Sequence, residues 1–393
     1  MSWSLANLGD LCEINIGRTP SRSRTDYWGR GYPWLSIADM NQGRAIVKTK
    51  ECITPLAVKE CNCREVQAET VLLSFKLSIG KVGIAQQPLF TNEAIAALPI
   101  RDHNRLDSKF LAWALQSIDL TQGLDRAAKG LTLNKAKLLN LRLPVPPVSE
   151  QCRLAAILDQ ADTLRAKRRE TLAQLDSLKQ SIFMEMFGDP ATNPKRWEVN
   201  PLHSFTLTVT NGMTRRRSER DEGTTIVLRL RDIRAGWIDF SDVNRITLEP
   251  NESKKYSVSP GDLLFIRVNG NPDYVGRCAI FEGHPEPVFF NDHIMRVKVD
   301  YSRILSVFLA FLLNGKYGKS EISKHRKTSA GQHTINQDGL GKIQLPTPPV
   351  AMQTEFVRRL ESIERQKATH SSSLAELDAL FASLQHRAFR GEL

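Results

Sequence analysis

The sequence lacks any apolar run long enough to cross a membrane. The longest one covers only residues 307–313, whereas a spanning helix needs about 20 apolar residues. The N-terminal residues contain neither the basic nor the apolar segment of a secretory signal. The six cysteines show no spacing typical of a disulfide framework or a zinc site. These absences predict a cytoplasmic protein with reduced thiols.

Motifs for catalysis are also missing. The sequence contains no glycine-rich phosphate loop, no paired-carboxylate nuclease motif with a lysine, and no cluster of His and Cys ligands. Residues 271–274, Asn-Pro-Asp-Tyr, partly match the Asn-Pro-Pro-Tyr/Phe tetrapeptide of amino-methyltransferases, but they have one proline only and follow no glycine-rich cofactor loop. Their neighbours Gly270 and Gly276 favour a turn. The sequence therefore predicts a chain with no catalytic activity, metal or cofactor of its own.

What the sequence does have is length and positive charge. A chain of 393 residues is too long for one ordinary hydrophobic core, so two or more domains are expected. Its 54 Lys and Arg residues exceed its 43 Asp and Glu residues, which gives a net charge of +11. A basic surplus of this size favours a polyanionic partner such as nucleic acid.

One motif occurs twice. Residues 143–151 read Leu-Pro-Val-Pro-Pro-Val-Ser-Glu-Gln, and residues 345–353 read Leu-Pro-Thr-Pro-Pro-Val-Ala-Met-Gln. The residues that follow match without a gap at the same offset, as Leu158 matches Leu360. A repeat on this scale indicates a tandem duplication of one structural unit.

Each copy of the motif follows a segment of mixed character. Residues 1–144 combine short apolar runs of strand length with a stretch of helical spacing that begins at Ser108, a residue suited to capping a helix. Residues 189–345 repeat this order loosely, and Gly17 answers Gly212. The expected fold is therefore α+β, with two globular mixed α/β domains that differ mainly in their loops.

After each proline motif, apolar and basic residues recur alternately four and three positions apart, which is the heptad spacing of a coiled coil. This pattern predicts spacer helices within residues 145–188 and 346–393. Both seams are apolar at their ends and basic in the middle. The seam residues expected at an interface are Leu154, Leu158, Arg165, Arg168, Leu172 and Leu175 in the first helix and Leu360, Ile363, Lys367, His370, Leu374 and Leu377 in the second.

Two helices of equal length most simply pair antiparallel. Each would be about 55 Å long at 1.5 Å per residue, enough to hold two DNA-binding modules about one helical turn or more apart. The alternative is a bundle core with no spacer role. The basic middle of the seam either fixes the register of the pair, faces a partner, or marks a solvated bend.

The loops that differ most between the two domains are basic at matching positions. Arginine binds guanine and amide side chains bind adenine, while lysines mostly contact phosphate. The alternative is a solvated surface with no ligand. The candidate DNA-binding residues are Arg18, Arg22, Arg24 and Lys129 in the first domain and Arg215, Arg216, Arg217, Arg220, Arg267, Asn269, Lys324, Arg326, Lys327 and Gln332 in the second.

With its two Leu-Pro-x-Pro-Pro motifs, two long helices and two divergent domains, the whole chain resembles the specificity subunit of type I restriction-modification systems. The resemblance implies that each globular domain is a target-recognition domain that reads one half of a bipartite DNA site. It implies that the helices form an antiparallel coiled coil that docks two modification (methyltransferase) subunits, which restriction (motor-nuclease) subunits join. S-adenosylmethionine, ATP and Mg²⁺ would then belong to those partners.

Two rival functions remain at this stage. An assembly scaffold would bind modification subunits without reading DNA. An autonomous methyltransferase would use residues 271–274 and would bind S-adenosylmethionine by itself. The second motif ends Val-Ala-Met-Gln, without the Ser-Glu of the first, so contacts that the first motif makes there need not occur at the second.

Overall fold

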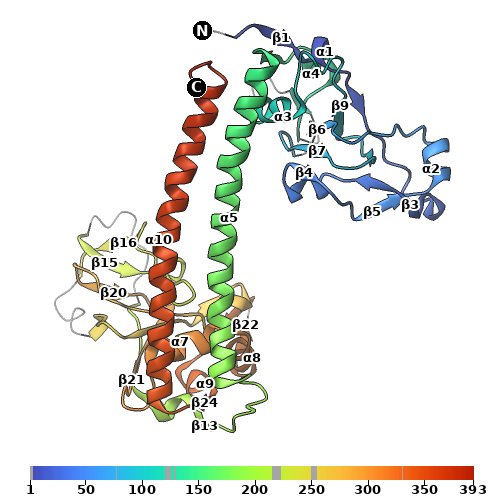
Figure 1. Ribbon diagram of the computed structural model, residues 1–393. Helices are drawn as coiled ribbons and strands as arrows, with labels where there is room; N and C mark the ends of the chain where they lie inside the picture. The colour runs from blue at the N-terminus through green and yellow to red at the C-terminus, as the bar shows by residue number, and fades with distance from the viewer. Residues whose placement is uncertain are drawn as a thin grey trace. The chain divides into compact units, whose positions relative to one another are not determined.

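The computed structural model describes residues 3–76, 78–118, 120, 125–127, 130–214, 223–248, 255–329 and 331–393, without the side chains of 125–127 and 130–132. The chain forms two compact units. Unit 1 consists of residues 1–171 together with 370–393, and unit 2 consists of residues 172–369. Each unit contains one globular module and one end of each of two long helices (Figure 1).

The long helices are α5 (Val148–Phe187) and α10 (Val350–Ala388). Each begins directly after a Pro-Pro pair. Proline has no backbone N–H, and it is tolerated at the start of a helix because the first N–H groups there have no partner within the helix. In unit 1, Arg165 of α5 pairs with Asp378 of α10, and in unit 2, Lys179 pairs with Glu364. Residue numbers rise along one helix as they fall along the other, which confirms the predicted antiparallel pairing.

The module of unit 1 is a mixed α/β structure. Its strands are β1 (Leu5–Asn7), β2 (Asn15–Ile16), β3 (Trp28–Leu35), β4 (Ala45–Ile46), β5 (Glu51–Ile53), β6 (Val71–Ser74), β7 (Val82–Ala85), β8 (Phe90–Thr91), β9 (Ile95–Leu98), β10 (Asp125–Ala127), β11 (Gly130–Thr132) and β12 (Arg142–Pro144). Its helices are α1 (Leu8–Leu11), α2 (Pro55–Glu60), α3 (Ser108–Ser117) and α4 (Lys135–Leu139). The sheets have the orders β2-β9-β6-β7-β4, β5-β3-β8, β1-β12 and β10-β11.

The module of unit 2 has the same plan. Its strands are β13 (Glu198–Pro201), β14 (Thr206–Asn211), β15 (Thr225–Leu228), β16 (Asn244–Ile246), β17 (Leu263–Ile266), β18 (Val268–Asn269), β19 (Cys278–Ile280), β20 (Val288–Phe290), β21 (Ile294–Val299), β22 (Lys327–Ser329), β23 (Gln332–Thr334) and β24 (Gln344–Thr347). Its helices include α7 (Ser306–Asn314), α8 (Lys316–His325) and α9 (Gln337–Gly341). The sheets have the orders β14-β21-β17-β19, β16-β15-β20, β13-β24 and β18-β23-β22.

The two modules share their topology as well as their order. The strands β2-β9-β6-β7 of unit 1 correspond to β14-β21-β17-β19 of unit 2, and β5-β3-β8 correspond to β16-β15-β20. In the latter pair of sheets, β3 pairs with β8 in parallel, as β15 does with β20. This agreement confirms the tandem repeat and the predicted fold class.

Gly17 and Gly212 show why the repeat keeps a glycine at this place. The Gly17 N–H donates to the Ile95 carbonyl at 3.1 Å, and the Gly212 N–H donates to the Ile294 carbonyl at 3.1 Å. A Cβ added at Gly17 would lie 2.2 Å from a backbone oxygen, and one at Gly212 would lie 2.1 Å from another. Only glycine allows the backbones to approach this closely.

Each hydrophobic core takes in both long helices. In unit 1, Trp113 of α3 packs in the same core as Leu158 of α5 and Phe381 of α10. In unit 2, Phe183 of α5 and Phe356 of α10 pack with their ring centroids 5.5 Å apart. A module is therefore held on the helix pair by the same apolar contacts that stabilise its own interior.

One detail of the sequence interpretation is wrong. Asp107, not Ser108, caps α3, because its side chain accepts a hydrogen bond from the Phe110 N–H at 2.8 Å. Ser108 is the first residue inside the helix. Among the residues that the structure describes, no helix is long and apolar enough to cross a membrane.

Candidate nucleic-acid interface

In unit 2, three of the predicted residues lie on one small sheet: Asn269, Lys327 and Gln332. β23 lies between β18 and β22 in this sheet. Asn269 of β18 is opposite His333 of β23, and Gln332 of β23 is opposite Ser329 of β22. The fold thus brings the stretch around Asn269 to the basic stretch that ends at Gln332, although the two lie far apart in the sequence.

The β22–β23 hairpin presents polar groups on both of its faces. Because strand residues alternate in direction, Lys327 and Gln332 share one face, and both are exposed. Asn269 and His333 share the other face with Thr328, whose hydroxyl lies 2.8 Å from Nδ1 of His333. A two-stranded β-ribbon fits the major groove of DNA. This hairpin is therefore the candidate DNA-reading element of unit 2.

Other predicted cations of unit 2 also hold the fold together. Lys324 pairs with Glu321, a buried carboxylate. Arg326 donates through Nη1 to the Pro272 carbonyl oxygen at 2.9 Å. Arg267 donates through Nη1 to the Asp292 carbonyl oxygen at 3.1 Å.

Lys327 differs from these cations. It forms no ion pair within the part of the chain that the structure describes, and it is exposed. Its charge contributes to lowering the pKa of Asp338, but its ammonium group can contact a phosphate without breaking an ion pair among the described residues.

In unit 1, two of the three predicted arginines are engaged by carboxylates. Arg22 forms two hydrogen bonds with Glu51, and its guanidinium lies 3.8 Å from the ring centroid of Trp28. Arg24 forms two hydrogen bonds with Asp26, at 2.8 and 2.6 Å. These bonds raise the pKa of each arginine and lower the pKa of Glu51 and of Asp26.

Arg18 is arranged differently. It donates through Nη1 to the Cys61 carbonyl oxygen at 3.1 Å and forms no ion pair with any residue that the structure describes. Its side chain borders an open hollow that Thr19 and Glu93 also line. Of the three predicted arginines, Arg18 is the one that has no ion pair within the described part of the chain.

Five predicted residues lie outside the described residues: Lys129, Arg215, Arg216, Arg217 and Arg220. The backbone on either side of Lys129 forms the β10–β11 hairpin. This hairpin corresponds to β22–β23, because the Leu133 N–H donates to the Phe75 carbonyl as the Ile335 N–H donates to the Arg267 carbonyl. A two-stranded hairpin therefore occurs at the same place in both modules.

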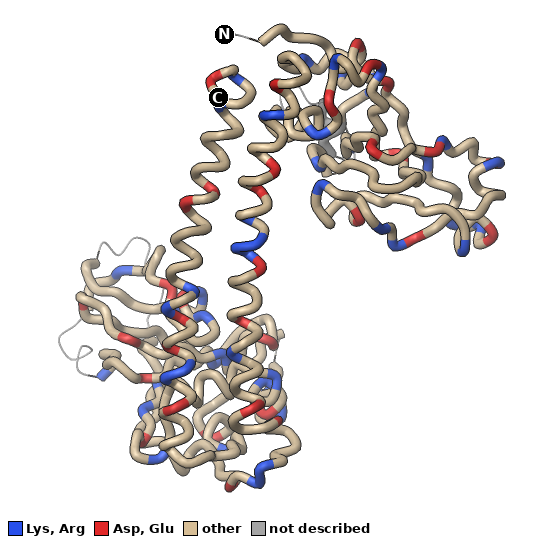
Figure 2. The backbone as a smooth tube through the Cα atoms, viewed as in Figure 1, with Lys and Arg blue, Asp and Glu red and all other residues tan. Residues whose placement is uncertain are grey.

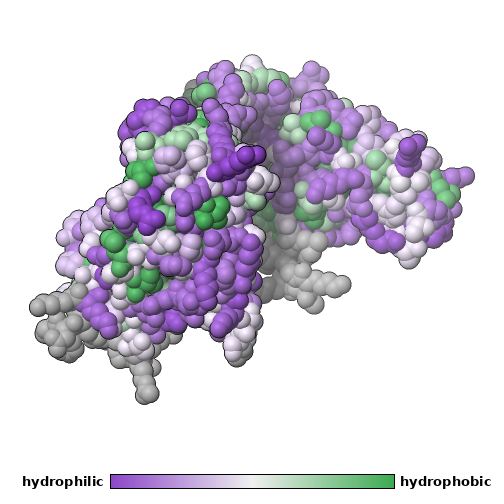
Figure 3. All heavy atoms as spheres, turned by 90° about the horizontal axis from the view of Figure 1, so that it is seen from below, coloured by the Kyte–Doolittle hydropathy of each residue, from purple (hydrophilic) through white to green (hydrophobic). Residues whose placement is uncertain are grey.

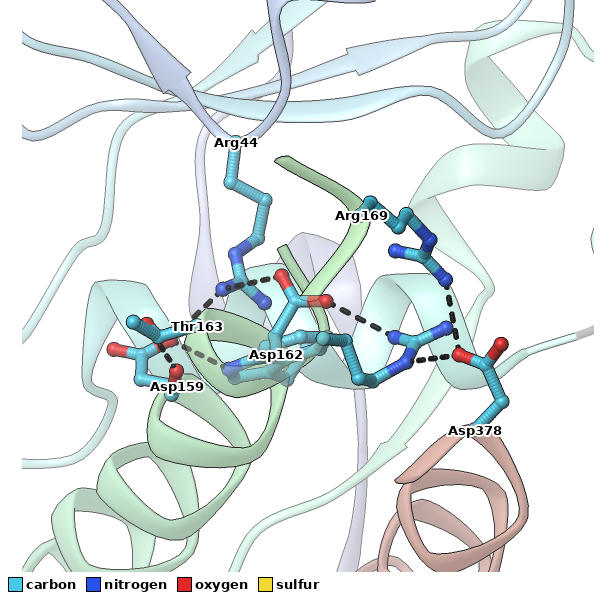
Figure 4. A network of polar contacts seen from close by, with 8 residues as sticks. Arg44, Asp159, Asp162, Thr163, Arg169 and Asp378 are labelled. Carbon is cyan, nitrogen blue, oxygen red and sulfur yellow. Dashed lines mark hydrogen bonds and ion pairs between the residues drawn. The ribbon is translucent and has the colours of Figure 1, made fainter. Parts of the chain in front are cut away.

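The basic middle of the helix seam forms ion pairs across the helix pair. In unit 1, Arg165 bonds with Asp378 and, at 3.0 Å, with Asp162, while Arg169 reaches Asp378 at 2.9 Å (Figure 4). Only 17% of the Arg165 side chain is exposed, and its guanidinium lies 4.2 Å from the ring centroid of Phe381. These contacts satisfy a partly buried cation on three sides.

Unit 2 repeats this arrangement at the equivalent positions. Lys367 corresponds to Arg165 and Asp176 to Asp378, and Lys367 and Asp176 form an ion pair. Lys179 pairs with Glu364 in the same cluster. In unit 1, Arg168 contacts Nδ1 of His370.

The charged middle therefore joins the two helices rather than interrupting them, and both helices continue through it. Figure 2 shows acidic and basic residues following one another along both helices. Because each cation has its partner on the opposite helix, these pairs favour one register of the antiparallel pair.

The apolar seam residues lie inside the chain. Leu154 and Leu158 are buried in the core of unit 1, and Leu360 is buried in the core of unit 2. Leu175 and Ile363 are also buried, and the remaining predicted apolar seam residues are half-buried: Leu172, Leu374 and Leu377. Their predicted contact with another subunit stays a prediction.

Arg44 is a structurally important side chain that the sequence interpretation missed. Its guanidinium lies 3.3 Å from the ring centroid of Trp113 and pairs with Asp159 at 3.0 Å and Asp162 at 3.4 Å, as Figure 4 shows in part. Burial lowers the pKa of Arg44, while the two carboxylates oppose that shift. Arg44 thus ties the module of unit 1 to α5.

Among the described residues, no group of His, Cys, Asp and Glu is arranged to hold a metal ion. Residues 271–274 form one turn, in which the Asn271 side chain caps the short helix η5 (Pro272–Tyr274). The face of the molecule in Figure 3 shows apolar residues scattered among hydrophilic ones. What the described surface offers is hydrogen-bonding and charged side chains on the β22–β23 hairpin of unit 2.

Comparison with known proteins identifies the family. The model of the type I restriction modification DNA specificity domain matches residues 2–175 and again residues 194–379. The chain belongs to this family. The two matches fall on the two repeats, so this type I specificity protein carries two DNA specificity domains.

Curated relatives support the same family over the full chain. The specificity subunits of the type I restriction enzymes StySPI of Salmonella potsdam and EcoKI of Escherichia coli K12 are each 27% identical, over 100% of this chain and 89% of theirs. The structure of the type I restriction-modification S subunit from M. genitalium covers 99% of this specificity protein and 96% of its own chain. Its TM-score is 0.60 at 16% identity, so that likeness concerns the fold alone.

Proposed function

We propose that this type I specificity protein reads a bipartite DNA sequence, with one module on each half. The observation that carries the proposal is the repeat itself. The two modules share their sheet order, yet the residues of their hairpins differ: where unit 2 has Lys327 and Gln332, unit 1 has Asp125 and Gly130. Two domains that share a scaffold and differ in their loops are typical of proteins that bind two different ligands through the same kind of surface.

The mechanism of readout follows from the exposed groups. In unit 2, the exposed Gln332 amide can offer a donor and an acceptor to one adenine edge, whereas the half-buried Asn269 already accepts a hydrogen bond from the Asn271 N–H at 2.8 Å. Lys327 contacts the phosphate backbone and sets the position of the hairpin in the groove. In unit 1, Arg18 supplies the corresponding charge. The hairpins read sequence, and the cations hold them in register with the duplex.

The helix pair sets the distance between the half-sites and docks two modification subunits. Its ion-paired seam supports this role, because a fixed register gives a fixed length. Adenine methylation and ATP-driven cleavage belong to the modification and restriction subunits, which bind S-adenosylmethionine, ATP and Mg²⁺. Residues 271–274 form a capped turn in this chain, which fits a subunit without catalytic activity.

Selection of DNA by the assembled complex tests the proposal. The chain is reconstituted with its modification subunits and incubated with a library of random duplexes, and the retained sequences are determined. We expect two short conserved blocks that flank an unconserved gap of fixed length. A scaffold that does not read DNA would retain no common sequence, and an autonomous methyltransferase would bind S-adenosylmethionine without its partners.

A further inference from the structure

Gln151, in the first turn of α5, is completely buried. Its side-chain oxygen accepts a hydrogen bond from the Asp107 N–H at 2.9 Å. Its side-chain nitrogen donates to the carbonyl oxygens of Arg105 at 2.9 Å and Pro146 at 2.8 Å. One amide therefore connects the proline motif and the helix to the segment that begins α3 of the module.

Gln353 makes the same three contacts in unit 2. It is also completely buried, and its oxygen accepts from the Leu305 N–H at 2.9 Å. Its nitrogen donates to the carbonyl oxygens of Arg303 at 3.3 Å and Pro348 at 2.8 Å. The two glutamines are the last residues of the repeated proline motif. Their shared hydrogen bonds explain why both copies of the motif end in glutamine.

The segments that each glutamine joins determine how a module sits on its helix. Asp107 is the cap of α3, and Leu305 is the cap of α7. α3 packs on β6 and β7, and α7 packs on β19. Apolar packing in the core has no strong directional preference, whereas hydrogen bonds are directional, and two of the three bonds of each glutamine join it to backbone atoms of the module.

We propose that Gln151 and Gln353 are positioning residues that fix the orientation of each module on its long helix, and so make spacing between the half-sites strict. This inference rests on the proposed function. An added or removed base pair rotates one half-site against the other by about a tenth of a turn. A module that could change its orientation on the helix would still reach the rotated half-site. A module held in one orientation by the buried amide would not.

The test compares glutamine variants at buried and exposed places on the same helices. Gln151→Met and Gln353→Met keep the length of the side chain but remove its donor and acceptor, which leaves buried backbone groups unbonded. Gln160→Met and Gln366→Met change exposed glutamines of α5 and α10 and serve as matched controls. Each chain is assembled with its modification subunits, and affinity is measured for duplexes with the selected gap and with gaps one base pair longer or shorter.

We expect wild type and both controls to prefer the selected gap. In Gln151→Met and in Gln353→Met, we expect the affinity ratio between the selected gap and the altered gaps to fall about tenfold, which corresponds to about 1.4 kcal/mol. The base preference within each half-site should be unchanged, because the reading hairpins are untouched. A purely structural role would weaken binding to all gaps equally and leave the ratio unchanged, and that result would overturn the inference.

Two further results separate the inference from the function on which it rests. If the wild-type complex shows no preferred gap or sequence, the proposed function itself fails. The milder variants Gln151→Asn and Gln353→Asn, which keep the amide but shorten its reach, are measured if the Met variants do not fold. Unfolding of the Asn variants as well would assign the glutamines to folding and overturn the positioning role.

Discussion

At the residue scale, Lys324 and Lys327 carry the same charge in different surroundings. Lys324 pairs with Glu321, whereas Lys327 forms no ion pair with a described residue. A cation that already has a carboxylate partner gains less from a phosphate, since it must share or lose that partner. The position of a lysine in the sequence therefore does not predict how much it contributes to the affinity for DNA.

Replacement of Lys327 tests this difference. We expect Lys327→Ala to weaken DNA binding by the assembled complex and to reduce the slope of log affinity against log salt by about one. Lys324→Ala is the matched control and should change the slope less. Equal slopes for Lys327→Ala and wild type would show that Lys327 does not contact phosphate.

The arginines of unit 1 show the limit of a sequence argument at this scale. The loop around Arg18 is basic in the sequence, which gives its three arginines the same predicted role. In the fold, Arg22 is compensated by Glu51, which lies 29 positions away. Only Asp26, two positions from Arg24, gave a local signal of charge compensation. Carboxylate partners that are distant in the sequence cannot be identified before the fold is known.

At the element scale, Arg44 connects a loop of the unit 1 module to α5. We expect Arg44→Met to destabilise unit 1 by about 2 kcal/mol, the value of a desolvated cation–π contact. The ion pairs with Asp159 and Asp162 would be lost as well. Urea unfolding followed by tryptophan fluorescence measures the change, with Arg30→Met, at an exposed arginine of the same module, as the control. An equal effect of both variants would contradict this assignment.

The seam also predicts a dependence on pH. The hydrogen bond from Arg165 lowers the pKa of Asp378 below its ordinary value of 3.8. Because its pKa is lower in the folded state, the Asp378 carboxylate stabilises that state at pH values above 3.8. This stabilisation is lost as the pH falls through the pKa that Asp378 has in the folded protein. We therefore expect helix pairing in unit 1 to weaken as the pH is lowered below about 4.

Amide exchange in α5 and α10, measured at a series of pH values, follows that pairing. Asp378→Asn cannot titrate, so it should weaken pairing at neutral pH and flatten the loss at low pH. If wild type and variant lose protection in parallel, the Asp378 carboxylate does not contribute to the seam.

The elements that the sequence predicted well are those with local signals. The proline motifs and the heptad spacing lie in short stretches, and together with the repeat they predicted both long helices and their pairing. The Arg44 contacts join residues 115 and 118 positions apart and had no local signal. Gln151 and Gln353 were visible as repeated letters, but their role needed the segments before α3 and α7 in place.

At the scale of the whole molecule, the two modules should be exchangeable. We expect replacement of residues 195–344 by the same segment of a related specificity protein to change one half of the recognised site and to leave the other half and the gap unchanged. Selection of bound duplexes by the assembled complex measures all three. A change in both halves would contradict independent reading by the two modules.

The central claim is that one chain reads two half-sites at a fixed distance. Sequencing of methylated adenines in the genome of cells that carry this chain and its modification subunits tests that claim most directly. The account predicts one bipartite motif, with two specific blocks, a gap of constant length, and methylation that disappears when this chain is deleted. A single continuous motif, a gap of variable length, or methylation that persists without this chain would contradict it.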